Sequence, residues 1–156
     1  MIYLQILEIM IKTVIKNCFD GHNQSFIYIW LSKNEQIVYV GMTNSFNGSI
    51  GRAGSHFSKQ GSLRKRFLDK KGYYINITED LLMYSFPLPQ KKIYTSKEKS
   101  YREAIEYNVQ KNLIINRSSV KPSFDVISWV RSSPRTSNLE VVKISNKIVS
   151  DFLKDY

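Results

Sequence analysis

Two short apolar runs joined by a polar break constrain the fold of this chain more than any other feature. The runs 26–31 and 36–42 are rich in aromatic and β-branched side chains, and residues 32–35 between them are polar. Runs of this length and composition favour β-strands, and a short polar connection favours an antiparallel pair. The sequence therefore predicts a β-hairpin at the start of a folded core.

Helices and one further strand are predicted after the hairpin. Residues 44–54 have the composition of a loop or an irregular helix start, 61–72 read as a basic helix ended by Gly72, and 80–86 read as a third strand. The spacing of Thr95 and Glu98 predicts a capping box that begins the longest helix, which continues to about residue 115. We therefore expect an α/β fold with a small central antiparallel sheet of about three strands, flanked by helices.

Three segments are predicted along the chain. Residues 1–24 form an N-terminal helical extension, 25–117 form the core, and 118–156 form a C-terminal extension packed on that core. In the last segment, 126–130 are predicted as a strand, 132–138 as a loop and 142–153 as a helix. The apolar start of the chain is interrupted by Glu8, Lys12 and Lys16, so it is too short and too charged to cross a membrane.

The net positive charge of the chain indicates which kind of molecule it binds. The sequence holds 23 Lys and Arg against 13 Asp and Glu, a formal net charge of +10. A folded domain this basic favours nucleic acid over the alternative of a surface charged for solubility alone. Cys18 is the only cysteine, which excludes an internal disulfide and a thiolate zinc cluster and fits the cytoplasm. Abundant Lys, Ile and Asn favour a bacterial or phage gene.

Several polar side chains have a spacing that suggests one site. The tripeptides Phe-Ile-Tyr at 26–28 and Tyr-Val-Gly at 39–41 fall on the two strands of the hairpin. Arg52 and His56 are four residues apart, which places them on one face of a helix. Glu106 lies beside the apolar stripe of the longest helix, whereas Glu103 lies farther from it. Alone, each pattern also fits an ordinary aromatic hairpin or a solvated surface pair.

Together, these residues resemble the active site of the GIY-YIG nucleases over roughly residues 25–116. The chain departs from the family pattern at Phe26, where the first tripeptide has glycine. The resemblance implies that Tyr28 is the general base and that Tyr39 and His56 orient the water or relay its proton. It also implies an asparagine after the longest helix, for which Asn116 is the better match and Asn112 the alternative.

The chemistry of phosphodiester hydrolysis suits the remaining residues. Arg52 can grip the scissile phosphate through its planar fork of donors. The resemblance makes Glu106 the single metal ligand, and one carboxylate can hold one Mg²⁺, for which Mn²⁺ can substitute, with waters and phosphate oxygens completing the shell. Because a free tyrosine has a pKa near 10, nearby cations must favour the phenolate of Tyr28.

A basic run after the Arg-His pair is the predicted DNA groove, with a solvated helix face as the alternative. Its members are Lys59, Arg64, Lys65, Arg66, Lys70 and Lys71. The leading hypothesis is a magnesium-dependent endonuclease acting on double-stranded DNA, of the compact type II restriction kind. A structure-specific repair or recombination nuclease is the first alternative, and a non-catalytic nucleic-acid-binding protein is the second. A short palindromic target would favour a homodimer on DNA.

Overall fold

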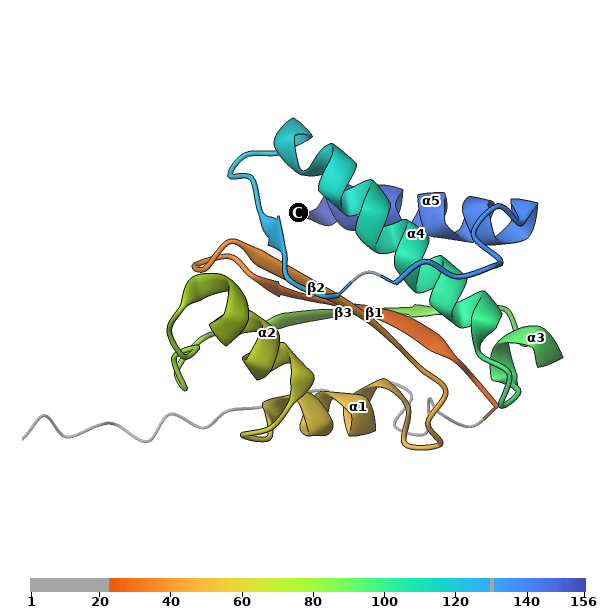
Figure 1. Ribbon diagram of the computed structural model, residues 1–156, viewed down its shortest axis with the longest axis horizontal. Coiled ribbons are helices and arrows are strands. Elements are labelled where there is room, and N and C mark those ends of the chain that lie inside the picture. The colour runs from red at the N-terminus through yellow and green to blue at the C-terminus, as the bar shows by residue number, and fades with distance from the viewer. Residues whose placement is uncertain (1–22, 130) are drawn as a thin grey trace, which may run out of the picture.

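The computed structural model describes residues 23–129 and 131–156, and it is an α/β fold in three layers. Figure 1 shows a central sheet with α1 and α2 on one face and α4 and α5 on the other. The elements follow in this order: β1 (Phe26–Ser32), β2 (Ile37–Thr43), α1 (Gly48–Phe57), α2 (Ser62–Lys71), β3 (Leu82–Pro87), α3 (Lys92–Thr95), α4 (Ser100–Asn116), the 3₁₀ turn η1 (Arg117–Ser119), β4 (Asp125–Val126) and α5 (Leu139–Asp155).

The sheet has four strands in the order β3-β1-β2-β4. The predicted hairpin is confirmed, since β1 pairs antiparallel with β2, and β3 pairs antiparallel with β1 on its other side. The expectation of about three antiparallel strands was wrong in one respect, because β4 adds a fourth strand parallel to β2. The added strand has two residues, too few for an alternating pattern that a sequence could reveal.

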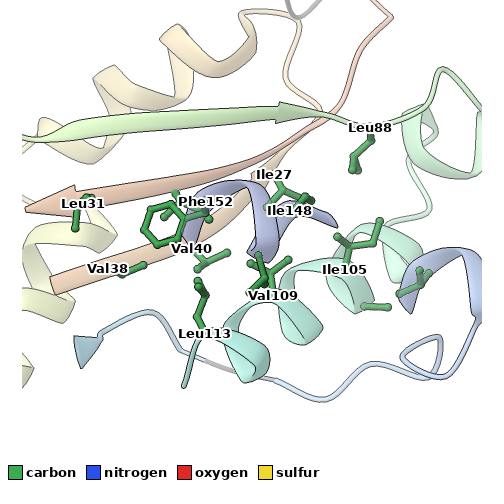
Figure 2. Packing of buried hydrophobic residues seen from close by; sticks show 14 of the residues in the cluster. Ile27, Leu31, Val38, Val40, Leu88, Ile105, Val109, Leu113, Ile148 and Phe152 are labelled. Carbon is green, nitrogen blue, oxygen red and sulfur yellow. The ribbon is translucent and has the colours of Figure 1, made fainter. Parts of the chain in front are cut away.

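Both faces of the hairpin are buried, and they pack against different helices. Figure 2 shows Ile27, Leu31 and Val40 packed among side chains of α4 and α5, including Ile105 and Phe152. The alternate residues of the strands, including both hairpin tyrosines, face α1 and α2, where they form a second cluster with two buried side chains of α2. The strand period of two thus directs Ile27, Leu31 and Val40 to one layer and both tyrosines, with Ile37, to the other.

The start of the longest helix differs from the prediction. Thr95 is the last residue of α3, and the Glu98 carboxylate accepts a hydrogen bond from the Ser100 backbone N–H at 2.7 Å, so no capping box forms. The chain between α3 and α4 is held instead by Arg102, whose guanidinium donates to the backbone carbonyl of Ser96 at 2.8 Å. The helix α4 therefore begins at Ser100, five residues later than the spacing indicated.

The C-terminal segment packs on the core through α5. The side chain of Asn138 accepts hydrogen bonds from the backbone N–H groups of Glu140 and Val141, which caps the helix where it begins. The helix runs to Asp155, longer than the predicted 142–153, and the predicted strand at 126–130 is reduced to β4. The predicted N-terminal helix lies outside the described residues. No helix in the described part of the chain is long and apolar enough to cross a membrane.

Candidate active site

In the hairpin, the side chain of Tyr28 lies over the backbone of the neighbouring strand, β2. Tyr28 on β1 is paired in register with Gly41 on β2. A Cβ atom on Gly41 would stand 2.2 Å from the Tyr28 hydroxyl oxygen, so any larger residue would displace the phenol ring. The tripeptide 39–41 therefore supplies both a tyrosine and the space through which Tyr28 reaches its partners.

The helix α1 presents Arg52 and His56 to the hydroxyl of Tyr28. The Arg52 Nε–H donates to the Tyr28 Oη at 3.1 Å, and the same oxygen lies 2.7 Å from Nε2 of His56. The predicted placement of Arg52 and His56 on one helix face is confirmed, and the structure shows that their common partner is Tyr28. His56 and Tyr28 are both fully buried.

Two further hydroxyl groups, that of Tyr39 on β2 and that of Ser62 on α2, are linked to the same histidine. The Tyr39 hydroxyl donates to Oγ of Ser62 at 3.1 Å, and that oxygen lies 3.2 Å from Nδ1 of His56. One neutral tautomer satisfies every contact: the Tyr28 hydroxyl donates to Nε2, and Nδ1–H donates to Ser62 Oγ. His56 thus lies between the two tyrosines, with ring centroids 5.3 Å and 5.0 Å away.

The protonation states follow from burial and from the charge of Arg52. Burial, and then the Arg52 guanidinium, lower the pKa of His56 to about 4, so the imidazole is neutral at pH 7. Burial raises the pKa of Tyr28 well above its usual range, although the Arg52 hydrogen bond acts in the opposite direction. The resting site therefore holds a phenol beside an imidazole whose Nε2 lone pair is free to accept its proton.

A pocket beside this network lies against α4 and has a volume of about 290 Å³. Glu103, Glu106 and Gln110 line it from one face of the helix. Burial, and then the charge of Glu103, raise the pKa of Glu106 to about 7. The Glu106 carboxylate also raises the pKa values of Tyr28 and Tyr39, which puts it within electrostatic range of the tyrosine network.

The helical spacing in the sequence predicts that Glu103 lies farther than Glu106 from the buried apolar stripe of the longest helix. In the structure both carboxylates line the same pocket, with Glu103 bound to Lys99 by an ion pair of 3.0 Å. The Glu103 side chain is 37% exposed and paired with Lys99, whereas Glu106 is the carboxylate whose charge reaches Arg52 and Tyr28. Because the charge of Glu103 adds to burial in raising the pKa of Glu106, Glu103 is a neighbour of Glu106 in the site.

The C-terminal segment completes the pocket with residues that lie beyond the part of the chain that carries the family resemblance, although Arg131 is one of four basic residues in which the sequence suggests a second contact region, with Arg135, Lys143 and Lys147. Trp129, Arg131 and Ser132 line the wall opposite α4. The Arg131 guanidinium lies 4.1 Å from the centroid of the exposed Trp129 ring, and that of Arg66 on α2 lies 5.6 Å from it. Both guanidinium groups are therefore attracted to the face of a ring that lines the pocket.

The basic residues of the predicted DNA groove do not lie on one surface, because those on α2 point to different sides of the helix. Arg66 faces the site, where it contacts Trp129; burial raises the pKa of Tyr39, and the charge of Arg66 acts in the opposite direction. Lys70 pairs with Asp125 at 3.8 Å, and the Lys71 ammonium donates to the backbone carbonyl of Glu35 at the hairpin turn. Arg64 lies on the opposite flank, and Lys59 and Lys65 are exposed.

The predicted asparagine is not part of the cluster. Asn116 ends α4, ten residues beyond Glu106, which is about 15 Å along the helix axis. Its side chain donates to the backbone carbonyl of Asn112 at 2.7 Å, and Asn112 in turn bonds Asn146 on α5. Both candidates therefore face a pocket between α4 and α5, away from the tyrosines.

A buried tyrosine shared by an arginine and a histidine, beside a carboxylate pocket on a basic domain, defines a nuclease-like site. The GIY-YIG catalytic domain matches residues 24–116, more than half of the chain, and includes both hairpin strands, α1 and α4. The chain therefore belongs to the GIY-YIG family, whose members are nucleases that act on DNA. No curated protein and no solved structure matches the chain.

Proposed function

We propose that this protein is a Mg²⁺-dependent endonuclease that hydrolyses phosphodiester bonds in double-stranded DNA, with Mn²⁺ able to substitute. The observation that carries the proposal is the single Tyr28 hydroxyl contacted by both Arg52 and His56, next to the Glu106 pocket. That hydroxyl has a donor to stabilise negative charge on its oxygen and an acceptor for its proton.

The proposed proton path runs through two residues. As water attacks phosphorus, its proton passes to the Tyr28 oxygen while the phenol's own proton passes to Nε2 of His56, 2.7 Å away. Arg52 has a second task, because a guanidinium can contact the phosphate and the phenol oxygen together. The relay avoids a free phenolate, whose formation burial opposes.

The residues at the pocket suit a divalent cation. Glu106 and Glu103 supply carboxylate oxygens, which are the donor type that Mg²⁺ prefers. Bound there, the cation would polarise a phosphate oxygen and stabilise the leaving oxyanion. Within residues 23–129 and 131–156, no group of three or more His, Cys, Asp or Glu side chains is placed to hold a metal ion.

The DNA backbone is proposed to cross the mouth of the pocket along Arg66 and Arg131. Arg66→Ala is expected to flatten the slope of log affinity against log salt by about 0.9, because one phosphate contact is lost. The matched control is Arg64→Ala on the other flank of α2, which should leave the slope unchanged. Binding titrations over a salt series measure both, and equal slopes for the two variants would remove Arg66 from the DNA surface.

The cleavage reaction should show a linked dependence on pH and Mg²⁺. The metal binds ionised Glu106, whose pKa is about 7 in the free protein, so protons and metal compete for this carboxylate. Below pH 7, the Mg²⁺ concentration that gives half-maximal rate should rise by about tenfold per pH unit; above pH 7 it should level off. At saturating Mg²⁺ the acid limb should move down toward the pKa of His56, about 4. A half-maximal Mg²⁺ concentration independent of pH would contradict this assignment.

The subtype that we propose is a compact type II restriction-type enzyme. The supporting observation is that Trp129, Arg131 and Ser132, which lie beyond the matched catalytic domain, line the same pocket as Glu106. Incubation with long unmethylated DNA and Mg²⁺ should give discrete fragments. Cutting only at flaps or junctions would favour a structure-specific nuclease, and binding without cutting in either metal would favour a non-catalytic protein. Sedimentation with a palindromic target tests the proposed homodimer.

A further inference from the structure

Gln110 is the polar side chain at the pocket that the proposed mechanism does not explain. It lies on α4 one turn beyond Glu106, is 1% exposed, and lines the pocket. Neither its Oε1 nor its Nε2 atom has a hydrogen-bond partner among the described residues. Burying an amide without hydrogen-bond partners opposes folding. The amide of Gln110 is therefore expected to have a partner that is not part of the protein, such as a bound ligand.

The surroundings of Gln110 identify the missing partner by its chemistry. Two carboxylates, those of Glu103 and Glu106, line the same pocket as Gln110, so two negative charges face one small space. A divalent cation would offset the repulsion between the carboxylates and also accept the free lone pairs of the Gln110 carbonyl oxygen. Glu103 and Glu106 outnumber Arg131, the cation among the lining residues, so an anion would still be repelled, and a neutral ligand would leave the repulsion between the carboxylates in place.

We infer that Gln110 is a metal ligand: its side-chain oxygen joins the carboxylates of Glu106 and Glu103 in holding the divalent cation. The inference rests on the proposed function, and it adds a specific residue to the metal site. The helix supplies the geometry, because positions 103, 106 and 110 fall on one face of α4 within two turns. The neutral amide adds an oxygen without a third charge, so DNA phosphate is not repelled further.

The test measures Mn²⁺ binding to the full-length protein without DNA, by calorimetry. Gln110→Met keeps the length of the side chain and removes both amide atoms; we expect Mn²⁺ affinity to fall by about 10-fold or more. The melting temperature of the metal-free variant should be equal or higher, because an unpartnered buried amide has been removed. Gln110→Glu keeps an oxygen in place and should bind Mn²⁺ at least as tightly as wild type. Gln90→Met, at an exposed glutamine, is the matched control and should change neither quantity.

The outcomes separate this inference from the function on which it rests. Wild-type Mn²⁺ affinity in Gln110→Met, together with lost binding in Glu106→Gln, would overturn the role of Gln110 alone and leave its amide to a buried water. Wild-type affinity in Glu106→Gln, or no Mn²⁺ uptake by the wild-type protein, would overturn the metal pocket itself. Lower melting temperatures and lost Mn²⁺ binding in both Gln110 variants would assign the amide to the fold, and would also overturn the inference.

Discussion

Replacing Glu106 with glutamine is expected to abolish Mg²⁺-dependent cleavage while leaving DNA affinity within several-fold of wild type. The amide keeps the shape of the side chain but loses the negative charge that attracts the cation at the pocket beside Tyr28. The phosphate contacts proposed for Arg66 and Arg131 are unaffected, so binding should persist. Single-turnover cleavage and a binding titration on the same DNA measure the two effects separately.

The stability of the Glu106→Gln variant provides an internal control. Folding raises the pKa of Glu106 from its usual value to about 7, so the folded protein binds more protons than the unfolded chain between those values. Stability from this group is therefore lost as pH rises through that window, and the metal-free variant should melt at an equal or higher temperature at pH 8. Full activity in the variant would exclude Glu106 from the metal site.

Two other carboxylates serve as comparisons for Glu106. Glu103→Gln should give an intermediate loss of rate, because Glu103 lines the same pocket but is the more exposed of the two. Glu140→Gln on α5, which loses an ion pair with Lys91, should cut at the wild-type rate. A rate loss in Glu140→Gln equal to that in Glu106→Gln would mean that general destabilisation, and not metal binding, explains the effect.

The parts of the site that the sequence could predict are those encoded by local spacing. The hairpin follows from two apolar runs and a polar turn, and the shared face of Arg52 and His56 follows from the helical repeat. Glu106 was distinguishable because it lies beside the apolar stripe that packs α4 on the sheet. Each of these inferences needs only a few neighbouring residues.

The parts that the sequence could not predict depend on contacts between distant segments. Trp129 reaches the pocket because β4 pairs with β2 across some 88 residues of chain, as the hydrogen bond from the Val40 N–H to Ser128 Oγ shows. Gln110 is ordinary in the sequence and becomes unusual only when its burial is known. Asn116 was chosen by its place after the helix, whereas the neighbour that decides its surroundings is α5.

Tyr28→Phe is expected to slow the chemical step by about 10²–10⁴-fold, the usual effect of removing a general base. The ring still fills the space over Gly41, so the strand pairing should survive. The hydroxyl is lost as a partner of His56, which leaves buried Nε2 unpaired and should cost about 1–3 kcal/mol of stability. Single-turnover rates below the melting temperature, with DNA affinity measured in parallel, distinguish the chemical effect from the structural one.

A matched tyrosine shows whether the loss is specific. Tyr84→Phe removes a hydrogen bond of similar length, 2.8 Å to Asp155, from a site on the other layer of the protein. It should leave the rate unchanged. Tyr39→Phe should have a smaller effect than Tyr28→Phe, because the Tyr39 hydroxyl is linked to His56 by hydrogen bonds through Ser62 and not directly. An unchanged rate in Tyr28→Phe would make this tyrosine a packing residue.

In the proposed relay, Tyr28 and His56 act as a unit, because Tyr28 can take the proton of water only while its own proton passes to His56. His56→Gln should slow the reaction, since the amide cannot take up the phenol proton that Nε2 accepts at 2.7 Å. Once His56 has been replaced, removing the Tyr28 hydroxyl should cost little more, because residues that act as a unit give non-additive losses. The double variant is therefore expected to react at close to the rate of Tyr28→Phe alone. If the two losses multiply instead, Tyr28 and His56 act in separate steps, and His56 serves to orient the site while another group takes the proton.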